Sequence, residues 1–175
     1  MKKIKNVLFL PAAIFFASCT FTVERESAVD ENVQGTNVAS KIRNGIELQS
    51  KGNLKVSQAF LLFDDGSLVP SSNQANVNQQ VNLRLIIEEG FTESNGKVEI
   101  GAAEKIETNT GQVLLDEKDL FHDLGEIEPE RAKMLTLNAV ITRLDKLYDY
   151  FVVSFRVWDK KGDNEITGSY KLYIQ

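Results

Sequence analysis

Alternation of apolar and polar side chains is the feature that most constrains what this chain can fold into. In residues 81–87, 151–157 and 166–174, apolar or aromatic side chains recur mainly at every second position. A period of two places successive side chains on opposite faces of a β-strand, so each run predicts a half-buried strand. Weaker runs of this kind cover residues 54–63, 98–106, 112–115 and 134–142.

Turn-forming residues separate these runs. They are Asp64-Asp65-Gly66, Asn95-Gly96, Asn109-Thr110-Gly111 and Lys161-Gly162-Asp163. Gly, Asn and Asp favour tight turns. Seven or eight short strands over residues 46–175 therefore predict an all-β domain with two packed antiparallel sheets, a β-sandwich. A lipocalin-like barrel is the alternative, but the Gly-x-Trp motif that marks that family near its first strand is absent.

Residues 137–151 permit two interpretations. Their apolar side chains recur at helical spacing, as in an amphipathic helix. The alternation from Leu135 to Ile141, followed by the turn-like pair Asp145-Lys146, indicates a strand, a turn and a second strand instead. We favour strand–turn–strand, with the helix as the alternative.

The last two strong runs predict a hairpin whose register can be stated. Inward side chains of adjacent antiparallel strands must face each other. The predicted inward pairs are Val157 with Ile166, Phe155 with Gly168, Val153 with Tyr170, and Phe151 with Leu172. The predicted outward neighbours are Tyr150 with Tyr173, Arg156 with Thr167, and Trp158 with Glu165.

Three outward aromatic residues of this hairpin are the candidate binding residues: Tyr150, Trp158 and Tyr173. An exposed aromatic platform can stack on sugars or anchor a protein partner. A neighbouring loop or strand that covered these rings would give them a purely structural role instead.

The N-terminus has the pattern of a secretory signal peptide. Three lysines within the first five residues precede an apolar run of 11 residues at positions 7–17. A helix that spans a bilayer needs roughly 20 residues, so this run is too short to span. The only Cys of the chain, Cys19, follows directly after Phe16-Ala17-Ser18.

Small residues before a Cys at the end of an apolar run resemble the lipobox of bacterial lipoproteins, although Phe16 stands where Leu is usual. The resemblance implies that residues 1–18 are a lipoprotein signal peptide, which signal peptidase II removes. It also implies that Cys19 carries a diacylglycerol and an acyl chain such as palmitate. Such chains anchor a protein firmly in a membrane, because each buried methylene contributes ~0.8 kcal/mol. The alternatives are an ordinary cleavable signal and an N-terminal anchor with a chance Cys.

Residues 19–45 are rich in polar residues and show no sustained period, so they predict a flexible spacer after the lipid anchor. An extra strand at residues 21–23 is the alternative. The strand pattern of residues 46–175 resembles the immunoglobulin-like domains of envelope lipoproteins in Bacteroidota-type bacteria, without the buried Trp and Cys pair of antibody domains. By resemblance, Thr20 in place of an Asp retention signal implies the outer membrane, with its periplasmic and surface faces both open.

The composition argues against several classes of function. A single Cys and a single His argue against disulfide scaffolds and Cys- or His-rich metal sites. Removal of residues 1–18 takes away three lysines and no acidic residue, so the formal net charge falls from −5 to −8. Nucleic-acid binding would require a basic face, so we expect no nucleic-acid partner.

Catalytic and metal-binding patterns are also weak. The chain has no Gly-x-Ser-x-Gly motif, and its single His, His122, lies in an acidic run that predicts a surface turn. The loop Asp159–Glu165 offers oxygen ligands, but its two lysines would repel a cation. We therefore expect no enzyme activity, no cofactor and no metal site.

The sequence thus favours a membrane-anchored, non-catalytic binding or adhesion module of the cell envelope, with a glycan or an envelope protein as its partner. The alternative is a structural accessory subunit of an envelope assembly, which docks through a sheet edge or the aromatic face. A hydrolase is a remote alternative, because spacing among 25 acidic residues singles out no catalytic pair.

Replacement of Cys19 by Ala tests the lipid anchor. Without the thiol, no thioether to diacylglycerol can form. Cys19→Ala should therefore abolish incorporation of a labelled fatty acid and release the protein from the membrane fraction. Unchanged membrane retention of the variant would contradict the lipoprotein prediction.

Overall fold

The computed structural model describes residues 41–142 and 146–175, which all belong to the unit Asn37–Gln175. The predicted signal peptide, Cys19 and the spacer up to residue 40 lie outside the described residues. In the two described segments, no helix is long and apolar enough to cross a membrane.

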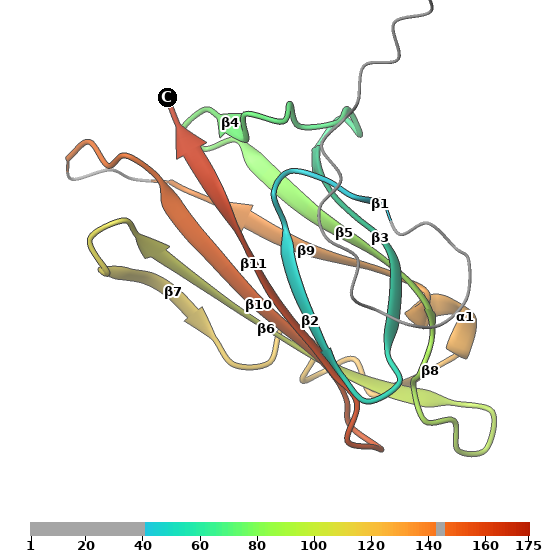
Figure 1. Ribbon diagram of the computed structural model, residues 1–175. Helices are drawn as coiled ribbons and strands as arrows, with labels where there is room; N and C mark the ends of the chain where they lie inside the picture. The colour runs from blue at the N-terminus through green and yellow to red at the C-terminus, as the bar shows by residue number, and fades with distance from the viewer. Residues whose placement is uncertain (1–40, 143–145) are drawn as a thin grey trace, which may run out of the picture. The chain divides into compact units, whose positions relative to one another are not determined.

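Strands make up most of the described chain, with one short helix (Figure 1). The elements are β1 (Lys41–Ile42), β2 (Glu47–Lys51), β3 (Lys55–Phe63), β4 (Gln74–Ala75), β5 (Gln80–Glu89), β6 (Val98–Thr108), β7 (Val113–Glu117), β8 (Glu126–Ile127), α1 (Pro129–Ala132), β9 (Met134–Val140), β10 (Phe151–Asp159) and β11 (Glu165–Ile174).

These strands form two sheets (Figure 1). The four-stranded sheet has the order β1-β3-β5-β9. The seven-stranded sheet has the order β2-β11-β10-β6-β7, to which β4 adds beside β11 and β8 beside β6. Apolar residues from both sheets share one buried core, so the predicted all-β, two-sheet sandwich is confirmed.

The chain passes between the sheets as in an immunoglobulin-like sandwich. The seven longest predicted runs correspond in chain order to β3, β5, β6, β7, β9, β10 and β11. The second and fifth of these, β5 and β9, pair in one sheet, whereas the third, sixth and seventh lie side by side in the other. Immunoglobulin-like domains pair their second, third, fifth, sixth and seventh strands in this way.

Two details of the predicted sandwich were wrong. The described chain has eleven strands rather than seven or eight, because β1, β2, β4 and β8 were not predicted. Three of these contain only two residues each and β2 is mostly polar, so alternation could not reveal them. In addition, β1 pairs with β3 and β4 pairs with β11 in parallel, so the sandwich is not purely antiparallel.

The core consists of inward rows of apolar side chains from both sheets. The inward rows of two central strands are Val81, Leu83, Leu85 and Ile87 on β5, and Phe151, Val153, Phe155 and Val157 on β10. Each of these side chains is at most 4% exposed. Full burial of one such side chain contributes roughly 1.5–3 kcal/mol, so these rows fix which face of each strand points inward.

The predicted register of the last hairpin is confirmed. Val157 pairs with Ile166, and the inward and outward pairs follow in step along β10 and β11 up to Phe151 and Leu172. For residues 137–151, β9 ends at Val140 and β10 begins at Phe151, as strand–turn–strand requires. Of the predicted turn pair, Asp145 lies outside the described residues.

The folded domain begins before residue 46, inside the segment that was predicted to be spacer. Lys41 and Ile42 form β1 and pair with β3, and Asn44 is only 9% exposed. The predicted boundary was wrong for residues 41–45 because a two-residue strand shows no period. Residues 41–45 join the fold through the backbone pairing of β1 and through the buried side chain of Asn44. Composition alone does not distinguish such a segment from a spacer.

Glu104 interrupts the apolar inward row of β6. It is 2% exposed, and neither carboxylate oxygen has a hydrogen-bond partner among the described residues. The hydroxyl of the buried Tyr170 likewise has none there. Burial raises the pKa of the Glu104 carboxyl to about 7, because a charged carboxylate loses its hydration in the core. Burial, followed by the charge of Glu104, raises the pKa of Tyr170.

The raised pKa of Glu104 makes the stability of the fold depend on pH. Below the ordinary pKa of 4.5, the carboxyl is protonated in both the folded and the unfolded chain. Between 4.5 and about 7, the unfolded chain releases this proton while the folded chain keeps it. The free energy of unfolding should therefore fall by about 3 kcal/mol as the pH rises through this window.

Glu104→Gln should remove this fall, because the amide stays neutral at every pH. Urea unfolding at about pH 4.5 and about pH 8 measures the effect. We expect similar stabilities of variant and wild type at the lower pH, and a more stable variant at the higher pH. An equal pH dependence in the two proteins would contradict the assignment.

Candidate functional site

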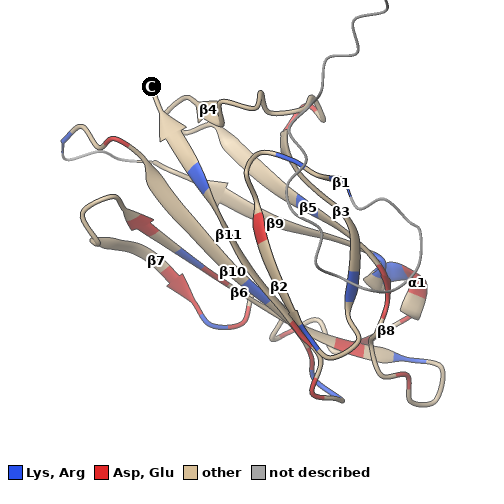
Figure 2. Cartoon of the chain, in the orientation of Figure 1, with Lys and Arg blue, Asp and Glu red and all other residues tan. Residues whose placement is uncertain are grey.

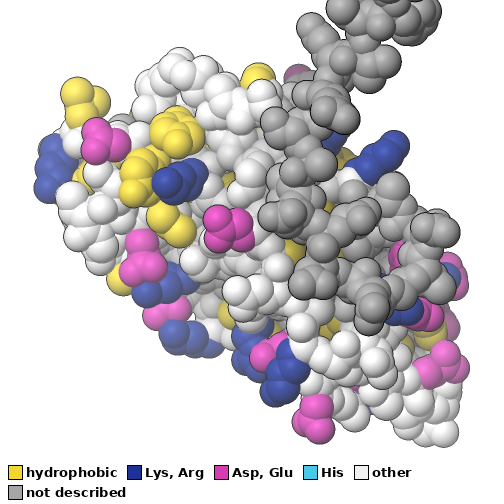
Figure 3. Space-filling view, viewed as in Figure 1, with side chains coloured by type: hydrophobic (Ala, Val, Ile, Leu, Met, Phe, Trp, Pro, Cys, Tyr) yellow, Lys and Arg dark blue, Asp and Glu magenta, His cyan; other side chains and the backbone are white. Residues whose placement is uncertain are grey.

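The structure brings two of the three predicted aromatic residues together. The rings of Tyr150 and Tyr173 meet edge to face, with 6.2 Å between centroids and an interplanar angle of 60°. Lys171 Nζ lies 4.4 Å from the centroid of the Tyr150 ring, which is a cation–π contact. We call Tyr150, Lys171 and Tyr173 the tyrosine patch. Hydrophobic side chains are exposed in this region, where β11 ends and β10 begins (Figure 3).

Trp158 is not part of the tyrosine patch. It lies eight residues from Tyr150, or about 26 Å along an extended strand. Its ring packs over Gly101, where an added Cβ would approach Trp158 Cε2 to 2.0 Å. The guanidinium carbon of Arg156 lies 4.7 Å from the ring centroid, and Arg156 Nε donates to Glu165 Oε2 at 2.8 Å. These neighbours leave Trp158 half-buried, in a packing role.

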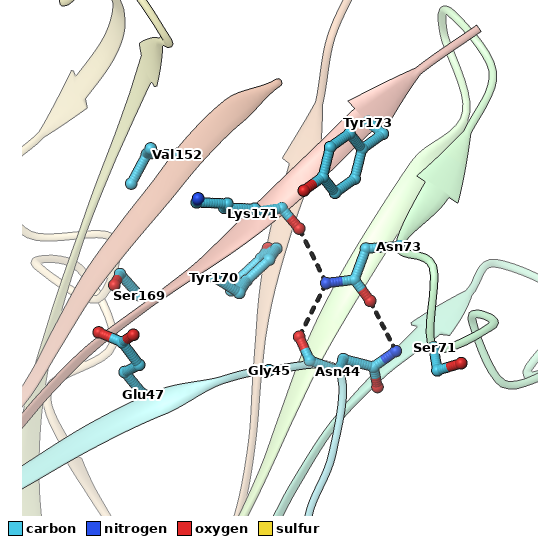
Figure 4. Close-up of a pocket in the computed structure, with 10 residues that line it drawn as sticks. All are labelled: Asn44, Gly45, Glu47, Ser71, Asn73, Val152, Ser169, Tyr170, Lys171 and Tyr173. Carbon is cyan, nitrogen blue, oxygen red and sulfur yellow. Dashed lines mark hydrogen bonds between the residues drawn. The ribbon is translucent and has the colours of Figure 1, made fainter. Parts of the chain in front are cut away.

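An open pocket of about 330 Å³ lies beside the tyrosine patch (Figure 4). Lys171 and Tyr173 belong to both the patch and the pocket lining. Glu47 on β2, Ser71 in the loop after β3, and Ser169 on β11 also line the pocket. Its volume is at the lower end of the range in which proteins bind small molecules, roughly 300–1,000 Å³.

Asn44 and Asn73 form the buried base of this pocket. Asn44 Nδ2 donates to Asn73 Oδ1 at 2.9 Å, and Asn73 Nδ2 donates to the carbonyl oxygens of Asn44 at 2.7 Å and Lys171 at 2.8 Å (Figure 4). Asn44 Oδ1 accepts from the backbone N–H of Leu61 at 3.1 Å. Because both amide groups are used within the protein, the two residues position the pocket rather than bind a ligand.

Polar groups nearer the solvent are available to a ligand. Among the described residues, the side chains of Glu47, Ser71 and Ser169 form no ion pair and no hydrogen bond. Glu47 and Ser169 are opposite each other in the pairing of β2 with β11, and their side chains lie next to each other in Figure 4. The pocket thus offers one carboxylate and two hydroxyl groups beside an exposed aromatic ring.

The other candidate residues from the sequence lie away from the tyrosine patch and make contacts within the protein. His122 is in an exposed turn, as predicted, where Nε2 lies 2.9 Å from Asp123 Oδ2. Asp159 is buried and accepts from the backbone N–H groups of Thr92 at 2.7 Å and Lys161 at 3.0 Å. The acidic loop therefore holds neighbouring backbone in place.

The charged side chains of the described residues do not form a stronger candidate site. Across residues 41–142 and 146–175, no group of three or more His, Cys, Asp or Glu residues is arranged to hold a metal ion. Lys and Arg are interspersed with Asp and Glu over several strands in the view of Figure 2. The tyrosine patch and the adjoining pocket are accordingly the candidate functional site.

Several residues of this site were missed in the sequence. Ser169 and Lys171 alternate with the inward residues of β11 and so share an outward face with Tyr173, which the pattern could have revealed. Glu47 belongs to a polar strand without clear alternation. Asn44 and Asn73 are 29 residues apart and meet only through the tertiary fold, so no local signal points to them.

Comparison with known proteins does not assign the chain to a family. No family model matches the sequence, and no curated protein matches it significantly. Among solved structures, the chain is similar to one described as the crystal structure of the C-terminal domain of wzt, at 16% identity and a TM-score of 0.44. That match covers 78% of this chain and 81% of the other, and at this TM-score it supports no conclusion about function.

Replacement of Asn73 by Ala tests the base of the pocket. The substitution removes three side-chain hydrogen bonds and leaves buried polar partners unpaired, which should lower the free energy of unfolding by about 3 kcal/mol. It also places Ala at a φ of 53°, a left-handed conformation that Asn tolerates but in which Ala is strained. Chemical denaturation measures the total loss.

Asn78→Ala is the matched control for Asn73→Ala. Asn78 has a φ of 65°, but it is exposed and its side chain makes no hydrogen bond to another described residue. The control therefore isolates the backbone strain, which we expect to cost about 1 kcal/mol. Equal losses for the two variants would show that the Asn44–Asn73 hydrogen bonds do not stabilise the fold.

Proposed function

We propose that the protein is a non-catalytic binding or adhesion lipoprotein of the cell envelope, which is anchored through Cys19 and binds its partner with the tyrosine patch. The observation that carries this proposal is the exposed contact of Tyr150 with Tyr173, beside a pocket whose Glu47, Ser71 and Ser169 side chains are unpaired among the described residues. The protein's partner is a glycan or an envelope protein.

Exposed aromatic side chains support a binding role because leaving them in water is unfavourable. Tyr173 is 37% exposed, whereas Tyr170 on the same strand is only 2% exposed. A tyrosine ring offers a large, rigid contact area and loses little conformational entropy on binding. Lys171 holds the adjacent Tyr150 ring from one side, which pre-orders the surface before a partner arrives.

The predicted N-terminal features fit this role. A lipid on Cys19 would keep the protein at a membrane, expected to be the outer membrane. The polar spacer up to residue 40 would let the sandwich contact partners at a distance from that membrane. A domain held in this way needs only modest affinity for each contact, because the membrane confines the protein and raises its local concentration.

A second candidate function is that of a structural accessory subunit in an envelope assembly. One observation favours it: all five residues of the edge strand β7 are exposed, including Val113 (48%), Leu114 (41%) and Leu115 (37%). An edge strand presents unpaired backbone groups to which a partner strand can add. In this case the partner would dock on β7 and not on the tyrosine patch.

Tyr173→Ala tests the proposed function. Partners are captured from envelope extracts, as both glycans and proteins, with the purified lipoprotein. Loss of a central aromatic contact at a binding surface costs at least about 2 kcal/mol, so capture should fall roughly thirtyfold or more. Met134→Ala is the control, because it removes an exposed apolar side chain (56%) from the other sheet.

Two outcomes would go against this assignment. If Tyr173→Ala and Met134→Ala capture partners as well as wild type does, the tyrosine patch is not the binding surface. If capture is instead lost when Leu114 on β7 is replaced by Asp, the accessory-subunit function is favoured.

A further inference from the structure

We infer that the partner of the tyrosine patch is a neutral oligosaccharide, which lies along β11 with its hydroxyl groups on Glu47 and a sugar ring on Tyr173. This inference rests on the proposed function and adds the chemical class of the ligand. Four properties of the site support it: its charge, its polar groups, its aromatic ring and its length.

Charge disfavours an acidic ligand. Lys171 is the only basic residue among the described residues that line the pocket, and its ammonium group lies 4.4 Å from the centre of the Tyr150 ring. The carboxylate of Glu47 has no ion-pair partner among the described residues. Glu47 and Lys171 carry opposite charges, so the described lining has no net charge, and a carboxylate or phosphate placed beside Glu47 would be repelled by its carboxylate.

The polar groups match the hydroxyl groups of a sugar. A carboxylate accepts hydrogen bonds through two oxygens, so Glu47 can accept from two adjacent hydroxyl groups of one sugar ring. The hydroxyl of Ser169, directly opposite Glu47 in the strand pairing, can donate or accept beside it. Adjacent hydroxyl groups that both donate to one carboxylate are a regular feature of a pyranose and are rare in a peptide.

The aromatic ring matches the apolar face of the same kind of ligand. A pyranose carries C–H groups on one face and hydroxyl groups around its edge. Tyr173 offers an exposed ring at the rim of the pocket, on which such a face can stack (Figure 4). A site with one stacking ring and a carboxylate suits a ligand that is apolar on its face and polar at its edge.

The length of the site requires more than one sugar. Ser169 and Tyr173 are four residues apart on β11, or about 13 Å along the strand. This separation exceeds the width of a single pyranose ring. A chain of sugars can place one ring on Tyr173 and the hydroxyl groups of another on Glu47, whereas a monosaccharide can reach only one end.

Calorimetric titration of the full purified lipoprotein tests this inference. The probes are neutral hexasaccharides of glucose, mannose and xylose, acidic hexasaccharides of galacturonic acid, and the neutral monosaccharides alone. We expect at least one neutral hexasaccharide to bind, with the acidic hexasaccharide and the monosaccharides at least tenfold weaker.

Variants assign the binding to the proposed residues. Glu47→Gln removes the charge that strengthens the hydrogen bonds, so the affinity for the neutral hexasaccharide should fall about tenfold. Glu117→Gln is the matched control: it removes an exposed carboxylate from β7, at the far edge of the same sheet, and should leave the affinity unchanged. Tyr173→Ala should weaken binding at least as much as Glu47→Gln.

Different outcomes separate this inference from the proposed function. If no neutral hexasaccharide binds, or if the acidic one binds more tightly, the inference is overturned. If Tyr173→Ala still abolishes capture of a different partner in that case, the proposed function is retained. If a neutral hexasaccharide binds but Glu47→Gln and Tyr173→Ala do not affect it, then both the inference and the proposed site are wrong.

Discussion

The hydrogen-bonded pair of Asn44 and Asn73 is the interaction on which the candidate site depends. Asn44 accepts from Leu61 on β3 of the four-stranded sheet, whereas Asn73 donates to the carbonyl of Lys171 on β11 of the seven-stranded sheet. The pair thus ties the two sheets together at one end of the sandwich. The backbone N–H of Tyr173 also donates to the carbonyl oxygen of Asn73 at 2.9 Å, so the same pair positions the strand that carries the exposed ring.

Buried and exposed polar groups have different roles in this arrangement. The buried amides form hydrogen bonds within the protein and keep the base of the pocket fixed, since an unpaired buried amide would be destabilising. The side chains nearer the solvent, those of Glu47 and Ser169, form no hydrogen bond or ion pair among the described residues and are available to the proposed ligand. A fixed base with unpaired outer groups lowers the entropy lost on binding, which suits a recognition surface.

The sequence predicted the parts of the fold that follow from strand alternation. The register of β10 and β11, and with it the meeting of Tyr150 and Tyr173, was predictable because the inward apolar rows and the turn at Lys161-Gly162-Asp163 together favour this alignment. A shared outward face does not make residues neighbours, and Trp158 lies eight residues from Tyr150 along the strand, too far for the two rings to form one platform. The buried Glu104 occupies an inward position that the alternation of β6 marks, although it was not singled out. Asn44 and Asn73 were beyond prediction because their contact is made only by the tertiary fold.

We propose that a ligand binds on the outward face of β11 next to the tyrosine patch. A direct measurement is nuclear magnetic resonance of the isotope-labelled protein, with backbone amide signals followed during titration with a neutral hexasaccharide that binds. We expect the largest shifts on Glu47, Ser169, Lys171 and Tyr173, with the amides of β7 unaffected. Shifts confined to β7, or to the four-stranded sheet, would contradict it.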